Sequence, residues 1–176
     1  MILLLGGLTI GILVNFMSAM FTQLVAIRLM DDPYSPLPDL IHLTTPVINK
    51  YMPDYFLGAS ALYAITSFDD LEDVEKNLSV LVSCLYIRSI TMFLTMMPTC
   101  MPYSEPTQCS FYGSLFHTSH DLMFSGYSLC FFLIGNITNT PVINYLGPFL
   151  LVVARQYYTI DVFISALVYN YVYMLH

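Results

Sequence analysis

Charged residues are scarce in this chain. Only 10% of its 176 residues are Asp, Glu, Lys or Arg, whereas 57% are hydrophobic, and the mean hydropathy is +0.68. A water-soluble globule of this length carries more charge than that, since about a quarter of the residues in ordinary soluble domains are charged. The composition therefore predicts an integral membrane protein.

Positive charge is the scarcest of all. The chain has 5 Lys and Arg against 12 Asp and Glu, which gives a formal net charge of -7. Nucleic-acid binding depends on a basic surface, so the sequence excludes that class of function. Many of the acids lie together in Asp69–Glu75, which we interpret as a solvated loop whose charges also favour the N-terminus of the following helix.

Motifs for cofactors and metals are missing as well. The sequence has no GxGxxG, no P-loop and no Cys and His set with zinc spacing, so we expect no cofactor and no metal. Of the four cysteines, Cys84 and Cys130 fall in apolar segments and are predicted to pack as small side chains. Cys100 and Cys109 share one polar loop and form a disulfide only if that loop faces an oxidising compartment.

Long apolar segments dominate what is present. A membrane-spanning helix needs about 20 such residues, and six segments approach or exceed that length: Ile2–Ile27, Tyr51–Ser67, Leu78–Met97, Leu122–Ile137, Pro141–Ala154 and Tyr158–Leu175. The first has no basic residue before its apolar part, which exceeds the apolar core of a signal peptide, so we expect a retained helix. Short connections leave no room for a soluble domain. The prediction is one all-α domain over residues 1–176, a six-transmembrane-helix bundle.

Two charged residues lie inside the predicted spans. Arg88 is in the third and Asp161 in the last, and such residues are costly in hydrocarbon. Thr91 and Thr95 follow Arg88 at helical spacing, and Tyr157 precedes Asp161 by one turn, so each helix has a polar face. We expect the two faces to meet in a polar cleft. Either a buried ion pair that fixes helix packing or a functional site explains this pattern.

Four short motifs, taken in chain order, favour the functional site. They are Ser35-Pro-Leu-Pro-Asp39, the helix from Arg88 to Pro98 with Thr91 and Thr95, Asp121-Leu-Met-Phe-Ser-Gly126, and Tyr158-Thr-Ile-Asp-Val162. With them the chain resembles the sphingomyelin synthase family, a branch of the lipid phosphate phosphatase superfamily. Each motif alone is weak. Together they cover almost the whole chain in the family's order.

The resemblance implies a head-group transfer reaction. In the family, a histidine before Tyr-Thr-Ile-Asp attacks the phosphorus of a phospholipid, and the aspartate holds that histidine in the correct tautomer. A second histidine, after Ser-Gly, protonates the departing lipid oxygen, and the phosphocholine group passes to ceramide. In this chain the two histidine positions are Tyr157 and Tyr127, while the aspartate is kept as Asp161.

Tyrosine is a poor substitute for either histidine. A phenol with a pKa of about 10 offers little phenolate at neutral pH, and a phosphotyrosine releases its phosphoryl group less readily than a phosphohistidine. Each lost acid–base group is worth a factor of roughly 10² to 10⁴ in rate, although residues that act as a unit do not contribute additively. The sequence predicts a degenerate transferase, with Tyr127, Tyr157 and Asp161 at the catalytic positions.

Groups that bind phosphate are better preserved than the catalysts. Ser125 and Gly126 can present backbone N–H groups at a helix start, and Arg88 and Arg155 are arginines of the kind that bind phosphate oxygens in pairs. The predicted partners are membrane phospholipid and ceramide-type lipids. The resemblance implies a role in sphingolipid metabolism in the Golgi or endoplasmic reticulum membrane or the plasma membrane.

Two alternatives stay open. The chain is a working transferase or lipid phosphatase if another histidine, drawn from His42, His117 or His120, replaces the missing ones. It is a membrane scaffold if the lipid chemistry has been lost entirely. The two tyrosines argue against the first alternative, and the retained Arg88 and Asp161 argue against the second.

Overall fold

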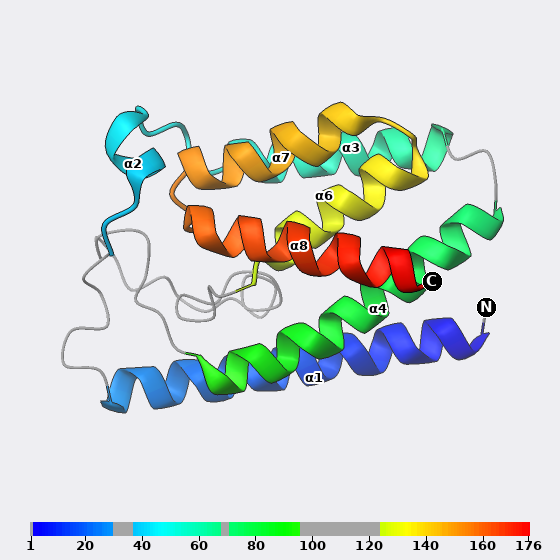
Figure 1. The fold of residues 1–176 in the computed structure, drawn as a ribbon, viewed down its shortest axis with the longest axis horizontal. Coiled ribbons are helices and arrows are strands. Elements are labelled where there is room, and N and C mark those ends of the chain that lie inside the picture. Colours follow the sequence, from blue (N-terminus) through cyan, green and yellow to red (C-terminus); the bar gives the residue numbers. More distant parts are fainter. Residues whose placement is uncertain (1, 30–36, 68–70, 96–123) are drawn as a thin grey trace.

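The computed structural model describes residues 2–29, 37–67, 71–95 and 124–176, and every regular element in these ranges is a helix. The helices are α1 (Ile2–Leu29), α2 (Leu40–Thr44), α3 (Met52–Ser67), α4 (Leu71–Leu94), α6 (Gly126–Ile137), α7 (Pro141–Val153) and α8 (Thr159–Leu175) (Figure 1). The all-α prediction is confirmed, and a helix occupies each of the six predicted apolar segments.

One helix boundary was predicted wrongly, and one short helix was missed. Helix α4 begins at Leu71, so part of the acidic segment that was interpreted as a loop is helical, with Glu72 and Asp73 in the first turn. Carboxylates in a first turn stabilise the helix through its dipole, and here that effect extends the helix beyond its apolar part. Helix α2, in the proline-rich connection, was not predicted because five residues are too few for a periodic pattern.

Helices α6 and α7 form an antiparallel hairpin. Ser125 caps α6 by accepting a hydrogen bond from the N–H of Ser128 at 3.1 Å. The turn after α6 holds Asn139 at a φ of 47°, and Pro141 begins α7, where a missing N–H is tolerated. These boundary residues place the two helices side by side with a short connection between them.

Close packing inside the hairpin depends on glycine. A Cβ added at Gly147 would lie 2.3 Å from the ring of Phe131, and one added at Gly135 would lie 1.9 Å from Oδ1 of Asn144. Phe131 is fully buried and belongs to a core cluster with Leu151 and Tyr157. The hairpin therefore packs against the residues that lead into α8.

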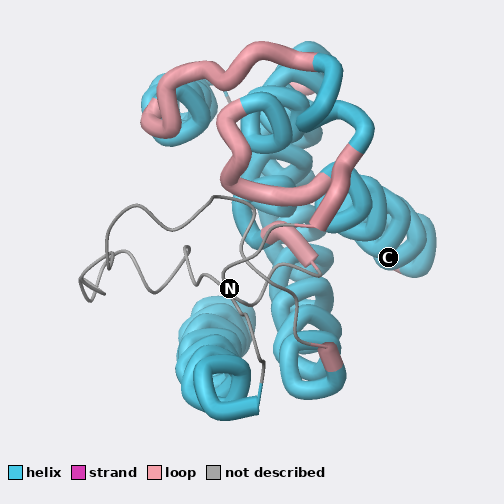
Figure 2. Tube along the Cα trace, turned by 90° about the vertical axis from the view of Figure 1, so that its left-hand side faces the viewer, coloured by secondary structure: helices cyan, strands magenta, loops and turns pink. Residues whose placement is uncertain are grey.

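Helix α1 lies along α4, and the remaining helices are on the other side of α4 (Figures 1 and 2). Polar side chains join the pair: the amide of Asn15 donates to the carbonyl of Leu85 at 3.1 Å, and the hydroxyl of Thr22 donates to the carbonyl of Met92 at 2.7 Å. Interhelical hydrogen bonds of this kind hold together helices that gain little from burying apolar surface.

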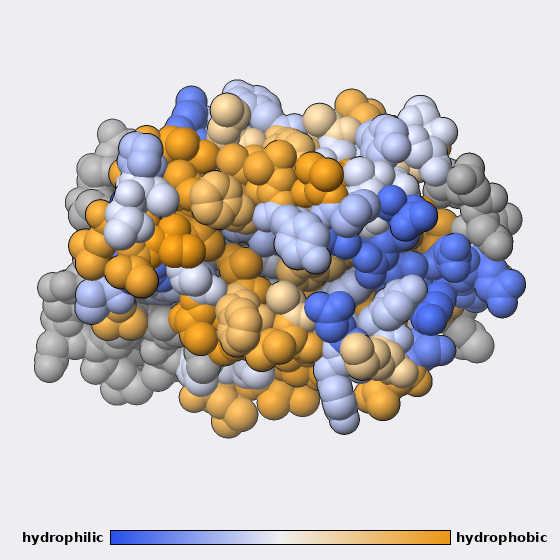
Figure 3. All heavy atoms as spheres, turned by 45° about the horizontal axis from the view of Figure 1, so that its top comes forward, coloured by the Kyte–Doolittle hydropathy of each residue, from blue (hydrophilic) through white to orange (hydrophobic). Residues whose placement is uncertain are grey.

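Hydrophobic side chains cover much of the surface. In the view of Figure 3 they extend over most of one face, and hydrophilic residues gather toward one end. Among the described residues, one helix is long and apolar enough to cross a bilayer, over Leu4–Thr22 of α1, while α6, α7 and α8 are apolar but shorter. This finding is weak evidence for membrane association, and the six-span arrangement stays a prediction.

Candidate functional site

Helix α8 begins after a largely buried corner, residues 155–158, that makes several hydrogen bonds to other parts of the chain. Tyr157 and Tyr158 are 1% and 2% exposed, and Arg155 just before them has a φ of 62°. The carboxylate of Asp161 accepts a hydrogen bond from the N–H of Tyr158 at 2.9 Å. Because the first N–H groups of a helix have no partner within it, an acid in the first turn stabilises its start.

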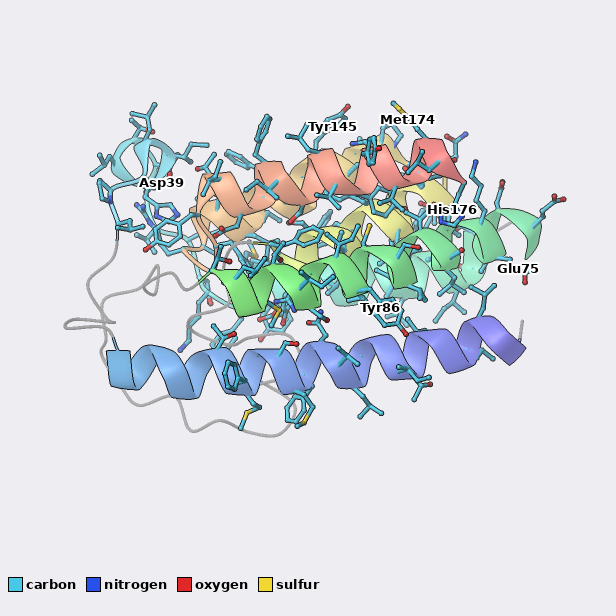
Figure 4. All side chains as sticks on the ribbon, turned by 60° about the horizontal axis from the view of Figure 1, so that its bottom comes forward. Asp39, Glu75, Tyr86, Tyr145, Met174 and His176 are labelled. Carbon is cyan, nitrogen blue, oxygen red and sulfur yellow. The ribbon has the colours of Figure 1, made fainter. Side chains whose placement is uncertain are left out.

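Residues 37–50 cover this corner. The carboxylate of Asp39 accepts hydrogen bonds from the N–H of Thr159 at 2.7 Å and from its hydroxyl at 2.8 Å, and it also caps α2 through the N–H of Ile41. The N–H of Leu37 donates to the hydroxyl of Tyr158 at 2.8 Å. Figure 4 shows Asp39 at the end of the molecule where α2 and α8 begin. The proline-rich motif and the Tyr-Thr-Ile-Asp motif are therefore in contact.

His42 is the histidine of this segment. Its Nε2 lies 3.1 Å from the carbonyl oxygen of Tyr157, and its ring stacks on that of Tyr158 with 5.7 Å between centroids. The side chain is half-buried. Sequence reasoning treated His42 only as a possible substitute base, and its proximity to Tyr157 depends on a fold-back that no local pattern indicates.

Arg155 was predicted to bind phosphate. Its guanidinium donates hydrogen bonds to the carbonyl of His42 and, at 3.2 Å, to that of Thr45. Both carbonyls lie at the C-terminal end of α2, where helix carbonyls have no partner of their own. The structure thus places Arg155 as a link between the corner and α2.

The two tyrosines at the family's histidine positions are neighbours in space. The rings of Tyr127 and Tyr157 have centroids 6.3 Å apart and are tilted by 53°. The phenol of Tyr127 also hydrogen-bonds the carboxylate of Asp54 on α3. The sequence alone did not indicate this contact, because Asp54 is distant from Tyr127 in the chain.

Arg88 is 3% exposed and is held from two sides. Its Nε donates to the carbonyl of Phe124 at 2.6 Å, and its Nη1 donates to the side-chain oxygen of Asn15 on α1. A Cβ added at Gly126 would lie 3.6 Å from the guanidinium carbon, so the charge rests directly against the first residue of α6. Asn15 is a further residue that the sequence did not reveal.

The start of α6 is also tied to α8. The hydroxyl of Ser165 lies 3.3 Å from the carbonyl oxygen of Ser125 and 2.7 Å from that of Asp161, and all three residues are fully buried. Arg88 and the Ser125-Gly126 turn therefore meet where α4 and α6 pack together, and Ser165, one turn after Asp161, ties α8 to the same turn. The polar cleft between Arg88 and Asp161 stays a prediction.

The predicted polar face of α4 has a more local role. The hydroxyl of Thr91 donates to the carbonyl of Arg88 at 2.8 Å, and that of Thr95 donates to the carbonyl of Thr91 at 2.7 Å. These are bonds within the helix, of the kind that Ser and Thr side chains commonly make.

Some predicted residues lie outside the described ranges. His117, His120, Asp121 and the pair Cys100 and Cys109 are among them. Within residues 2–29, 37–67, 71–95 and 124–176, no group of three or more His, Cys, Asp or Glu side chains is arranged to hold a metal ion.

The charges where Arg88 meets the start of α6 favour the binding of an anion. A helix start carries partial positive charge from its N–H groups, and the Arg88 guanidinium adds a full positive charge beside Gly126. Arginine and helix N-termini are the two groups that most often bind phosphate. The described residues define a class: an all-helical protein with a candidate anion site beside two phenols, Tyr157 buried and Tyr127 half-buried.

Comparison with known proteins does not assign the chain to a family. No protein-family model matches the chain, and no curated protein matches it either. The resemblance to the sphingomyelin synthase family therefore rests on the four motifs.

Proposed function

We propose that this protein is a sphingomyelin synthase-like membrane protein that binds the phosphate head group of a phospholipid and transfers it slowly or not at all. The observation that carries the proposal is the position of the Arg88 guanidinium against Gly126, the first residue of α6. A guanidinium and the start of a helix both favour an anion bound beside them.

The phosphate would be held by Arg88 together with N–H groups at the start of α6. Arg88 is fixed by Asn15 and by the carbonyl of Phe124, so its orientation is set before a ligand arrives. A pre-organised arginine loses less conformational entropy on binding than a mobile one. Ceramide-type lipids are the proposed second partner, on the basis of the resemblance alone.

The tyrosine pair supports the loss of transfer. In the proposed site Tyr157 stands where the nucleophile is needed and Tyr127 stands where the acid is needed, and their rings are in contact. Asp161 keeps the family's aspartate, with one oxygen bonded to the N–H of Tyr158. The protein is then a pseudoenzyme derived from a phosphocholine transferase.

Placement in the membrane is part of the proposal. Large apolar side chains such as Leu13, Met17 and Tyr145 are more than half exposed, as expected for surfaces that face lipid. We propose that the six long helices all enter the bilayer of the Golgi, the endoplasmic reticulum or the plasma membrane. Helices α6 and α7 are about 18 and 20 Å long at 1.5 Å per residue, so the bilayer would thin around them.

Lipid carried through purification tests the head-group site. Phosphatidylcholine bound per folded molecule would be measured by mass spectrometry after gentle detergent extraction of the original protein, Arg88→Gln and Arg155→Gln. Loss of a charge-assisted hydrogen bond is worth about 2 kcal/mol, so we expect Arg88→Gln to bind lipid roughly thirtyfold more weakly. Arg155→Gln should keep its lipid, because that guanidinium binds the carbonyls of α2. Equal lipid in all three proteins would make Arg88 a packing residue and contradict the proposal.

A further inference from the structure

Residues 37–50, which cover the Tyr157 corner, present their large apolar side chains outward. Leu40 and Leu43 on α2 are 75% and 76% exposed, and Leu37 and Val47, which flank the helix in the chain, are exposed as well. Apolar side chains this exposed are unfavourable in water. A set of them on one segment marks a surface that contacts another apolar surface.

The charged and titratable side chains in the middle of the segment point the other way. The carboxylate of Asp39 accepts two hydrogen bonds from Thr159, and Nε2 of His42 lies 3.1 Å from the carbonyl oxygen of Tyr157. Both side chains are half-buried against the corner. A helix on a water-facing surface directs its apolar side chains inward and its polar ones outward. Residues 37–50 reverse that arrangement, as a lipid-facing surface does.

The place of the segment in the fold connects it to the surface that we propose faces lipid. Helix α2 lies beyond the neighbouring ends of α7 and α8 (Figure 1), and Figure 4 shows Asp39 and Glu75 at opposite ends of the molecule. Exposed apolar side chains continue from the segment onto Tyr51 and Tyr55 at the start of α3 and onto Ile160 at the start of α8. The apolar surface is therefore continuous from α2 to the long helices.

Charge at the end of the segment favours lipid head groups. Lys50 is exposed, and its Nζ lies 5.1 Å from the centroid of the Tyr51 ring. Lysine and tyrosine are typical of membrane interfaces, where the ammonium reaches the phosphates and the ring lies at the level of the head groups. Asp39 is the one acid in residues 37–50, and Thr159 already occupies it. No exposed carboxylate of the segment therefore opposes the phosphates.

We propose that residues 37–50 bind the lipid surface of the bilayer, with Leu40 and Leu43 inserted at the boundary between head groups and acyl chains. An interfacial helix buries its apolar face about 5–10 Å into this boundary. Lipid covers the outer face of the segment, while Asp39 and His42 hold its inner face on the corner. The Tyr157 corner is thereby placed at the depth of the head groups.

The inference rests on the proposed placement in a membrane and is independent of head-group binding by Arg88. The chain contains no tryptophan, so a single introduced tryptophan reports the depth of one position. The full chain would carry Leu43→Trp on α2 or, as the matched control, Leu13→Trp in the middle of the apolar span of α1, where the leucine is also exposed.

Quenching of tryptophan fluorescence measures the depth. Each variant would be reconstituted in vesicles of phosphatidylcholine whose acyl chains carry bromine either near the head groups or near the bilayer centre, because bromine quenches at close range only. We expect bromine near the head groups to quench the Leu43→Trp probe about twice as strongly as bromine at the centre. The Leu13→Trp probe should show the opposite order, because its position is at mid-span.

A second variant separates the segment from the probe, since tryptophan itself favours membrane interfaces. Adding Leu40→Asn to Leu43→Trp removes one inserted side chain and should lower quenching by bromine near the head groups about twofold. Iodide dissolved in the water should then quench the probe more strongly. An unchanged depth would show that the tryptophan, and not the leucines, sets the position, and would contradict the proposal.

The remaining outcomes distinguish the segment from the membrane placement. Strong quenching of the Leu43→Trp probe by iodide with none by bromine would overturn the proposal, while bromine quenching of Leu13→Trp would leave the placement of α1 standing. Shielding of the Leu43→Trp probe from both quenchers would indicate a protein cover, such as a second copy, and would also overturn it. A lack of bromine quenching in both variants would contradict the membrane placement together with this inference.

Discussion

The phenol ring of Tyr127 lies 6.3 Å from that of Tyr157, although the two residues are on opposite sides of the α6–α7 hairpin in the chain. The resemblance to sphingomyelin synthases requires two histidines that act on the same phosphorus from these positions. Two phenols in contact occupy the positions instead, and Asp54 bonds to one of them. Under the proposed function, the two positions lie close enough to act on one phosphorus, and tyrosines stand where the reaction needs histidines.

Asn15 is expected to be necessary for stability because it receives a hydrogen bond from the buried Arg88. Asn15→Leu removes this acceptor and leaves part of the guanidinium without its described partner. Hydrogen bonds to charged groups contribute about 1.5–3 kcal/mol, so the free energy of unfolding should fall by about 2 kcal/mol. Thermal unfolding in detergent measures the change. Thr9→Leu, at an exposed position on the same helix, should change it by less than about 0.5 kcal/mol, and an equal effect would contradict the assigned role.

Gly147 is expected to tolerate no side chain. Gly147→Ala places a Cβ 2.3 Å from the ring of Phe131 and should destabilise the protein by about 1–3 kcal/mol through overpacking. Gly58→Ala is the matched control, since an added Cβ there meets nothing within 4 Å, and alanine should stabilise that helix by up to about 1 kcal/mol. Unfolding midpoints that move in the same direction for both variants would argue against the close approach of α6 and α7.

Asp39 is expected to hold the proline-rich segment on α8. Asp39→Ala removes the acceptor of two hydrogen bonds from Thr159 and of the cap on α2, and the loss of such caps costs about 1–2 kcal/mol. Limited proteolysis should then cut residues 37–50 faster than in the original protein. Asp39→Asn keeps one side-chain oxygen and should give an intermediate rate. Equal protection of all three proteins would show that these bonds do not fix the segment.

Glycosylation tests the orientation that the resemblance implies, in which the site faces the lumen or the cell exterior and both termini are cytosolic. The sequence has two Asn-x-Ser/Thr sites, Asn77 and Asn136, in parts of the chain that the family's topology places in the cytosol. Both amides are also bonded inside the protein, Asn77 to Tyr169 and Asn136 to Tyr169 and Asn144. We expect neither to carry a glycan when the chain is expressed in a eukaryotic cell. A mass shift removed by endoglycosidase and abolished by Asn77→Gln would reverse the proposed orientation.

The helices were predictable because apolar runs bounded by polar residues and prolines determine them. The ends of the helices were harder to predict: the acids after Leu71 were expected to precede α4, whereas Glu72 and Asp73 lie in its first turn. Short α2 was not predictable, because its formation depends on the cap from Asp39 and on contacts of Arg155 and His42 with distant residues.

For the site, helical spacing predicted that the Arg88 and Asp161 helices face each other; the structure packs α4 against α8 and places Arg88 beside Gly126. The partners of these residues were not predictable. Asn15 contacts Arg88 and Asp54 contacts Tyr127 through packing of helices far apart in the chain, and no pattern in one helix indicates which side chain of another it will meet.

Restoring the histidines tests whether the rest of the proposed site still supports head-group transfer. Tyr127→His with Tyr157→His returns both imidazoles to positions that are neighbours in space. If the rest of the site is intact, the rate of head-group transfer by the double variant should exceed that of the original chain at least about 10²-fold. That factor is the lower value for a single acid–base group. A folded double variant with no gain would indicate that residues other than the two tyrosines have also been lost.

Head-group transfer by the original chain tests the central claim most directly. The purified protein would be incubated with labelled phosphatidylcholine and ceramide beside the variant Asp161→Asn, and labelled sphingomyelin would be quantified. The account predicts the same background level of product from both proteins, because the tyrosines at 127 and 157 cannot replace the histidines. Robust product from the original chain that disappears in Asp161→Asn would show a working transferase and contradict the account.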